Sequence, residues 1–521
     1  MFAATCYLLV AMLNFLVMPY TLRILGKPVF GAWQILMTIF SYSAFLDFGI
    51  STALAKYVAE YNARNDEEAV NAIANTGLVS YLTISVAGTL FLLLISKWFL
   101  RWLLSPSAGG AVANQVGLLD EVSFGYYWVV AITFTMVVGK SFRMILIGMQ
   151  KLYLINTIEI AVQIPAICIL VFLLHGGYGF RGFVELYFFQ YAIVNALLVY
   201  YSLKTTSGFR INLFAASSMW FKKMCGFGWK TSLPGVSTVI QSQIERLALA
   251  RFGGLEVVAM WAFGAKLVDV VRLSVTPAIN MVMPAASELS VSNTGESLRS
   301  LHKLGTKFLI VALFPLGWLI FATAPLFITA WLGAGYDDSV LSLRFLIIAA
   351  INHLTFSVAA NVARGKGRTS QDLVSSVVLV AAELVLVLVL GRRFGYIGIL
   401  TSTLIAYTLC SLTTFVVVYK AERISVVSSL IRVYGPPYVL SVIAALPVIW
   451  VNYLNRVQIT NHAAASHRYL YLGRQALLQT VVFLVIYAVM LRVSGYMKQD
   501  EVRTLRQAMR AAGLRRRVST V

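Results

Sequence analysis

The chain has 521 residues, of which 59% are hydrophobic and only 12% are charged, and 42 Lys and Arg against 21 Asp and Glu give a formal net charge of +21. Soluble globular proteins carry about 25% charged residues, so this chain has too little polar surface to cover a water-soluble body. The basic residues lie between hydrophobic segments, which favours membrane lipids as their partners and argues against nucleic acid.

Long hydrophobic segments recur along the whole chain. A helix that spans a bilayer needs about 20 mostly apolar residues, and fourteen segments meet this requirement, the first of which lacks the basic start and cleavage site of a signal peptide. They cover residues 2–22, 30–54, 73–95, 123–147, 153–174, 179–203, 230–252, 256–283, 305–331, 339–362, 371–390, 395–419, 434–453 and 474–494. The sequence therefore predicts an all-α polytopic membrane protein with about 14 transmembrane helices.

The distribution of positive charge predicts the orientation. If both termini are cytoplasmic, the even-numbered loops and the C-terminal tail face inward, and these regions hold most of the 42 Lys and Arg residues. This bias agrees with the positive-inside rule and supports an even number of helices. Both the N- and the C-terminus are therefore expected in the cytoplasm.

The segments group into five predicted regions. Residues 213–230 contain both aromatic and basic residues. This combination is typical of segments at the lipid headgroup layer, so the segment is predicted to be interfacial. The tail has apolar residues on one helical face and Arg on the other, which favours either a helix on the anionic inner leaflet or a solvated end. The regions are an N-terminal lobe at 1–203, an interfacial linker at 204–229, a C-terminal lobe at 230–419, two additional helices at 420–494 and a basic tail at 495–521.

A weak internal repeat relates the starts of the two predicted lobes. A shift of 228 residues aligns five identical pairs, which are Arg23 with Arg251, Gly26 with Gly254, Trp33 with Trp261, Glu60 with Glu288 and Gly77 with Gly305. Five identities are near chance, but parallel repeats about an axis along the membrane normal are a known plan of transporters.

Charges within the hydrophobic segments are the main functional signal. The eighth segment carries Lys266, Asp269 and Arg272 along one helical face, and the seventh carries Glu245 and Arg246. Charges at the centre of a bilayer normally face a partner or a polar cavity. Internal salt bridges are one interpretation, and a solvated cavity with surplus positive charge is the other.

Further basic residues near helix ends enlarge the predicted cavity. Arg23, Lys56 and Arg251 add three positive charges, and a cationic cavity of this kind attracts an anion such as phosphate. Among the acidic residues, Asp47 has no basic residue within one turn of its own helix. A carboxylate in such a setting can exchange a proton or bind sodium, so Asp47, Glu245 and Asp269 are candidate sites for H⁺ or Na⁺.

Several kinds of chemistry have no sequence support. Neither a Walker motif nor a GxGxxG motif occurs, so a nucleotide-hydrolysing site of that type is not expected. His, Cys, Asp and Glu do not cluster at metal-ligand spacing. The sequence therefore predicts neither an enzyme nor a bound cofactor or metal, and energy would come from an ion gradient, the membrane potential or the substrate gradient.

Three regions of the chain carry a recognisable set of residues. The first, in the opening helix pair, contains Pro19, Arg23, Leu25, Gly26, Phe30 and Gly31 and then Leu46, Asp47, Phe48, Gly49, Ile50 and Ser51. The second, in the seventh and eighth segments, contains Ile244, Glu245, Arg246, Phe252, Gly253, Ala265, Lys266 and Leu267, and the third, before the tenth segment, contains Leu332, Gly333 and Tyr336. These regions resemble the polysaccharide and O-antigen flippases of the multidrug/oligosaccharidyl-lipid/polysaccharide exporter superfamily, which implies a bacterial inner membrane as the location. The sequence departs from the usual pattern at Glu245, where Asp is more common, and the charge is kept.

The resemblance implies both a fold and a function. It implies two six-helix lobes that form a V around a central cavity, with two additional C-terminal helices. It also implies an undecaprenyl-pyrophosphate-linked oligosaccharide as the substrate, flipped outward for the synthesis of O-antigen, capsule or exopolysaccharide. Polysaccharide polymerase or assembly proteins are the candidate protein partners.

Three alternatives stay open. A cation-coupled drug antiporter of the same superfamily commonly has an acidic residue in its first helix, whereas residues 1–22 contain none. A peptidoglycan-precursor flippase would need the same basic cavity. A membrane glycosyltransferase or polymerase would usually show a large outward loop with clustered acids or arginines, and no such loop occurs here.

Overall fold

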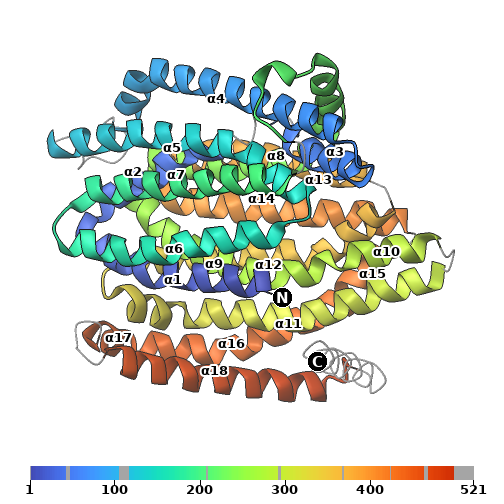
Figure 1. Ribbon diagram of the computed structural model, residues 1–521. Helices are drawn as coiled ribbons and strands as arrows, with labels where there is room; N and C mark the ends of the chain where they lie inside the picture. Colours follow the sequence, from blue (N-terminus) through green and yellow to red (C-terminus); the bar gives the residue numbers. More distant parts are fainter. Residues whose placement is uncertain are drawn as a thin grey trace, which may run out of the picture. The chain divides into compact units, whose positions relative to one another are not determined.

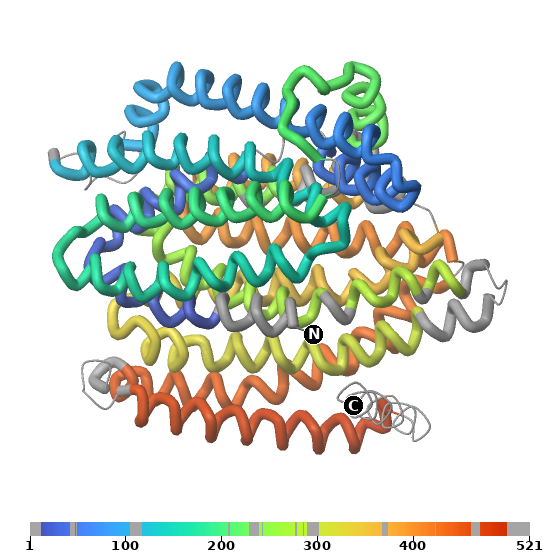
Figure 2. The backbone as a smooth tube through the Cα atoms, viewed as in Figure 1, coloured from blue at the N-terminus to red at the C-terminus, as the bar shows by residue number. Residues whose placement is uncertain are grey.

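The computed structural model describes residues 2–42, 47, 49–104, 116–206, 209–291, 295–366, 369–422, 424–462 and 468–497. In these residues all regular secondary structure is helical, and Figure 2 follows the path of the backbone. The helices before residue 281 are α1 Phe2–Leu25, α2 Lys27–Tyr42, α3 Ile50–Ala63, α4 Glu67–Leu103, α5 Val116–Gly148, α6 Leu152–His175, α7 Gly179–Thr205, the 3-10 turn η1 Leu213–Ala215, α8 Ser218–Phe252 and α9 Leu255–Asn280.

The remaining helices include two short π-helical turns, η2 and η3. They are α10 Val282–Val291, α11 Gly295–Leu332, α12 Asp337–Gly365, α13 Thr369–Leu386, η2 Val387–Gly391, α14 Arg392–Ala421, α15 Val426–Ser429, η3 Leu430–Tyr434, α16 Gly435–Leu454, α17 Arg456–His462 and α18 Arg468–Val493. Most of the described residues in each of the fourteen predicted segments are therefore helical.

The helices have the dimensions and surfaces of membrane spans. Within the described residues, nine helical segments are long and apolar enough to cross a bilayer, from Glu67–Leu103 to Tyr469–Val493. Large apolar side chains such as Leu94, Phe172 and Val493 stand more than 70% exposed, and such faces need lipid rather than water. The prediction of an all-α, multi-pass membrane protein is confirmed.

The second predicted segment, 30–54, is not one continuous helix. Helix α2 ends at Tyr42 and α3 begins at Ile50, and the described residues between them, Asp47 and Gly49, lie in a turn. Gly49 has a φ of 75°, in the left-handed region where glycine carries no steric penalty. Hydropathy alone does not reveal this break, because the segment stays apolar across it.

By contacts the chain divides into two compact units, residues 1–271 with 372–410 and residues 272–371 with 411–521. In the first unit, α7 packs along both α5 and α6, and the three run side by side in Figure 1. In the second unit, α11 packs against α16 and α18, which Figure 1 shows as neighbouring orange and red helices. The predicted division into lobes at 1–203 and 230–419 stays a prediction.

Two helix pairs of the first unit share a feature at residues that the repeat aligns. Gly26 between α1 and α2 has a φ of 77°, and Gly254 between α8 and α9 has a φ of 86°. At both positions, therefore, a left-handed glycine separates two consecutive helices.

The backbones of these two helix pairs approach each other closely at one point. A Cβ atom on Gly31 of α2 would lie 1.8 Å from the carbonyl oxygen of Leu255, at the start of α9. Only glycine allows the two backbones to lie so near each other. This contact brings α2 and α9 together beside the candidate site.

Candidate functional site

A cavity of about 200 Å³ in the first unit contains three of the predicted site residues. Its walls come from α1, α2, α6, α7, α8 and α9. The polar and aromatic lining residues are Asn14, Thr21, Phe30, Trp33, Gln34, Phe183, Tyr187, Arg246, Trp261, Lys266 and Asp269. Trp33 and Trp261, which the repeat pairs, both line it, and this set is called the basic cavity below.

Aromatic and acidic side chains surround Arg246. Its guanidinium carbon lies 5.4 Å from the centroid of the Trp261 ring, a cation–π distance. The indole Nε1 of Trp261 donates a 2.8 Å hydrogen bond to Glu245, which is only 4% exposed. Glu245 and Asp269 both act electrostatically on Arg246. The buried Nε of Arg246 finds no hydrogen-bond partner in the described part of the chain, so it can donate to a ligand.

The lining of the basic cavity has a positive balance. Arg246 and Lys266 share the lining with a single carboxylate, that of Asp269, so the lining alone has a formal net charge of +1. The charge of Glu245, which does not line the cavity, also acts on Arg246. An Arg fork and a Lys ammonium beside aromatic walls are a set that binds phosphate esters. The role of these residues in substrate binding stays a prediction.

Four predicted basic residues lie outside this lining. Arg23 is exposed in the last turn of α1, and Arg251 is half-buried in the last turn of α8. Lys56 is exposed, with its Nζ 4.2 Å from the centroid of the Phe227 ring. Arg272 is the first residue of the second unit, where its charge acts on His353. The structure therefore does not gather all six basic residues into one set.

Asp47 is fully engaged in fastening a turn. Its carboxylate accepts hydrogen bonds from the Tyr81 hydroxyl, from the Ser51 hydroxyl at 2.6 Å and from the Ser51 amide at 3.3 Å. A carboxylate before the first turn of a helix satisfies amide donors that the helix leaves free. These bonds tie the start of α3 to α4.

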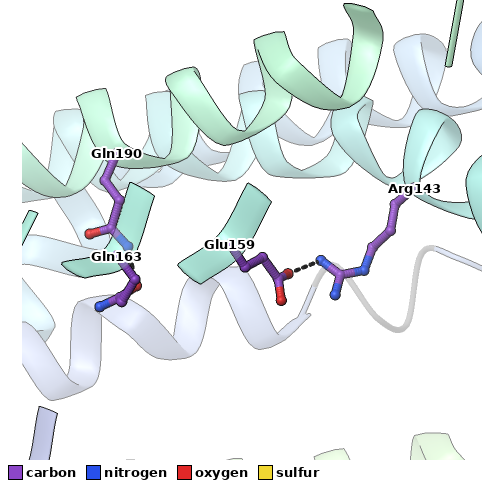
Figure 3. A network of polar contacts seen from close by, with 4 residues as sticks. All are labelled: Arg143, Glu159, Gln163 and Gln190. Carbon is purple, nitrogen blue, oxygen red and sulfur yellow. Dashed lines mark hydrogen bonds and ion pairs between the residues drawn. The ribbon is translucent and has the colours of Figure 1, made fainter. Parts of the chain in front are cut away.

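A second cavity, of about 460 Å³, lies between α5, α6 and α7 of the same unit. Its polar lining residues are Lys140, Arg143, Asn156, Glu159, Gln163, Gln190, Tyr191 and Asn195. Figure 3 shows Arg143 paired with Glu159, and the side chain of Gln190 directed toward Gln163. We call this set the amide cavity.

A chain of side-chain amides connects the two cavities. Gln190 donates to Gln163, and Gln163 in turn donates a 3.5 Å hydrogen bond to Asn14. Asn14 lines the basic cavity, whereas Gln163 and Gln190 line the amide cavity. The sequence carries a signal for this set, since Gln163 and Gln190 are polar interruptions of apolar segments, but only the fold brings them together.

Glu383 is a buried carboxylate that the predicted site did not include. It is fully buried on α13 and accepts a 2.9 Å hydrogen bond from Thr403 of α14. Its second oxygen, Oε2, has no hydrogen-bond partner within the described ranges, and the charge of Glu245 acts on it. Two acidic groups buried near each other cannot both hold an uncompensated negative charge.

The helical fold with charged cavities defines a multi-pass membrane protein, and solved structures of transporters share that fold. A lipid II flippase, MurJ, in an inward closed conformation aligns with a TM-score of 0.65 at 12% identity, over 94% of this chain and 97% of that one. A multidrug resistance MATE family transporter of the MOP superfamily, inward-facing, gives a TM-score of 0.62 at 16% identity, over 81% and 95%. A MOP superfamily transporter from Pyrococcus furiosus gives 0.54 at 15% identity, also over 81% and 95%.

The sequence itself matches one family model. The model, described as polysaccharide biosynthesis protein, matches residues 1–290, and the chain belongs to this family. That match covers α1 to α9 and thus the whole lining of both cavities. No curated protein matches the sequence.

Proposed function

We propose that this protein flips an undecaprenyl-pyrophosphate-linked oligosaccharide across a bacterial inner membrane for surface polysaccharide synthesis, with both termini in the cytoplasm. The observation that carries the proposal is the basic cavity, where Arg246 and Lys266 exceed Asp269 in charge. The family and the fold support the same class of function. The protein is thus a transporter rather than an enzyme, and polymerase or assembly proteins are its candidate partners.

In this proposal the pyrophosphate binds in the basic cavity. Arg246 offers a buried Nε donor that nothing else in the described chain uses, and a guanidinium binds two phosphate oxygens in a fork. Lys266 supplies a second, point-like charge. Arg23, Lys56, Arg251 and Arg272 act outside this lining, where they attract the anion on its path rather than hold it.

The amide cavity suits the sugar part of the substrate. Carboxamides such as Gln163 and Gln190 and the Arg143–Glu159 pair present donors and acceptors together, as hydroxyl groups of a sugar require. Tyr191 adds an aromatic surface. The volume of about 460 Å³ lies in the range of ligand pockets, and the amide chain through Asn14 connects it to the proposed phosphate site.

The proposed coupling ion is H⁺ or Na⁺, bound at the pair of Glu245 and Glu383. Because Glu383 Oε2 lacks a partner in the described residues, a proton or a cation would offset the cost of its burial. Asp47 and Asp269 are the other candidates. Asp47 accepts hydrogen bonds from two hydroxyl groups and one backbone amide, which favours a structural role for it.

A peptidoglycan-precursor flippase is the second candidate function. It also needs a cationic cavity for a pyrophosphate, and the MurJ structure, that of a lipid II flippase, shares the fold over 94% of this chain. The two functions differ in the sugar and so in the demands on the amide cavity. Rescue of surface polysaccharide in a strain without its own flippase, with no rescue of a strain depleted of its lipid II flippase, favours the first.

Charge neutralisation in cells tests the basic cavity. Arg246→Gln and Lys266→Gln are each expected to lower surface polysaccharide at least tenfold, because each removes a charge-assisted contact of about 1.5–3 kcal/mol. Arg101→Gln is the matched control, since Arg101 is exposed in the last turn of α4 and lines neither cavity. Full polysaccharide with both cavity variants, at equal protein levels, would refute the proposed phosphate site.

A further inference from the structure

The second unit contains a basic pocket that the proposed function does not use. A pocket of about 510 Å³ lies between the start of the apolar part of α11, the end of α14, the α15–η3 turn and the residue Tyr496. Its lining includes His302, Lys303, Lys307, Ser428, Arg432 and Tyr496. None of these residues lines the basic cavity or the amide cavity.

The charge of this pocket is strongly positive. Lys303, Lys307 and Arg432 line it, and no carboxylate does so among the residues whose placement is described. Glu422, which acts on the nearby His302, is bound to Lys366 at 2.6 Å. An anion placed among cations that share one hollow is attracted to each of them, so the pocket suits a negative ligand.

Buried polar atoms point to the same conclusion. His302 is only 3% exposed, its ring packs edge-on against Tyr419 with centroids 4.9 Å apart, and its Nε2 finds no hydrogen-bond partner in the described chain. A buried polar atom without a partner is costly and rare in folded proteins. A ligand oxygen in the pocket would satisfy it as an acceptor.

The walls of the pocket are fixed by an irregular turn. Arg432 and Val433 belong to the π-helical turn η3, a feature that frequently marks functional sites. The hydroxyl of Tyr496 donates a 2.6 Å hydrogen bond to the Val433 carbonyl. Its ring lies 4.6 Å from the Nζ of Lys307, which is itself 9% exposed. The segment after α18 is thereby held against the other walls.

The pocket also lies where apolar spans end. Two apolar spans begin near the lining, at His302 and at Val426, and two others end near it, at Ala421 and at Val493. Each of these four points is within a few residues of the lining. Ends of spans are the level of the lipid headgroups, and basic residues there attract anionic lipid.

We propose that this pocket binds a phosphate group, carried either by an anionic phospholipid or by a soluble phosphate compound. Arg432, Lys303 and Lys307 supply the positive charge, and Ser428 and His302 supply further polar contacts. Phosphate oxygens accept charge-assisted hydrogen bonds from all of these donors. The pocket is larger than a water-sized site, so the group to which the phosphate is attached also fits inside.

Binding of phosphatidylglycerol to the purified full-length protein in detergent tests the proposal. Arg432→Gln and Lys303→Gln change exposed side chains, so the fold is kept, and each is expected to weaken binding about tenfold by removing a charged contact. Lys420→Gln is the matched control, because Lys420 is exposed in the last turn of α14 but does not line the pocket. It should bind phosphatidylglycerol as the unchanged protein does.

Two further probes separate the sources of the phosphate. Displacement of phosphatidylglycerol by inorganic phosphate supports a soluble ligand, whereas resistance to inorganic phosphate supports a lipid headgroup. Both results support the pocket. Equal binding of diacylglycerol, which lacks the phosphate, or unchanged binding of phosphatidylglycerol in the Arg432 and Lys303 variants, would overturn it. The assay involves no transport, so its outcome is independent of the proposed flippase activity.

Discussion

At the scale of residues, the charged cavity depends on a few side chains whose roles come from their neighbours. Arg246, Lys266 and Asp269 could be selected from the sequence, because each charge interrupts an apolar segment. The bond of Glu245 to Trp261 and the burial of Glu383 could not, since they depend on how neighbouring helices pack and rotate against each other. Lone polar residues carry no pattern that reveals their partners.

Glu383 is expected to take part in ion coupling. Glu383→Gln removes the buried charge and keeps an oxygen that can accept the Thr403 hydrogen bond. Flipping in proteoliposomes should then lose its dependence on pH or on sodium, while the protein stays folded. The comparison variant is Asp47→Asn, which should keep that dependence and lower thermal stability, because Asp47 fastens α3 to α4. The reverse pattern would place the coupling site at Asp47.

At the scale of elements, hydropathy predicts most of the helices, but it does not predict where they break or which helices contact each other. The fourteen apolar segments coincide with helix, yet the turn at Asp47 and Gly49 interrupts one of them. Glycine positions decide such features, through a positive φ at Gly49 and a backbone contact at Gly31. The sequence alone shows that these glycines are present but not which backbone lies opposite them.

Gly31→Ala should destabilise the first unit. A Cβ there would lie 1.8 Å from the Leu255 carbonyl oxygen, so α2 and α9 must separate, at a cost of about 1–3 kcal/mol as for other overpacked sites. Thermal unfolding of the purified protein measures this effect. Gly226→Ala in α8 is the control, because a Cβ there meets nothing within 4 Å. An unfolding midpoint of Gly31→Ala equal to that control would contradict the packing described here.

At the scale of the whole molecule, the basic residues that give a net charge of +21 fall into groups with different roles. Those in loops are predicted to orient the chain in the membrane, those in the basic cavity are proposed to hold the substrate, and those around the start of α11 are proposed to hold a second phosphate. Composition predicted the membrane class, and motifs predicted the family. The amide cavity and the basic pocket lined by His302, Lys303 and Arg432 could be recognised only in the structure, because each is assembled from separate helices.

The most direct test of the proposed function is flipping of a fluorescent undecaprenyl-pyrophosphate-linked oligosaccharide in proteoliposomes. The unchanged protein should move the label across the bilayer faster than protein-free vesicles do. The double variant Arg246→Gln/Lys266→Gln should lower the rate by at least about tenfold, since both positive charges of the basic cavity are lost. A double variant that flips the labelled lipid as fast as the unchanged protein would contradict the account.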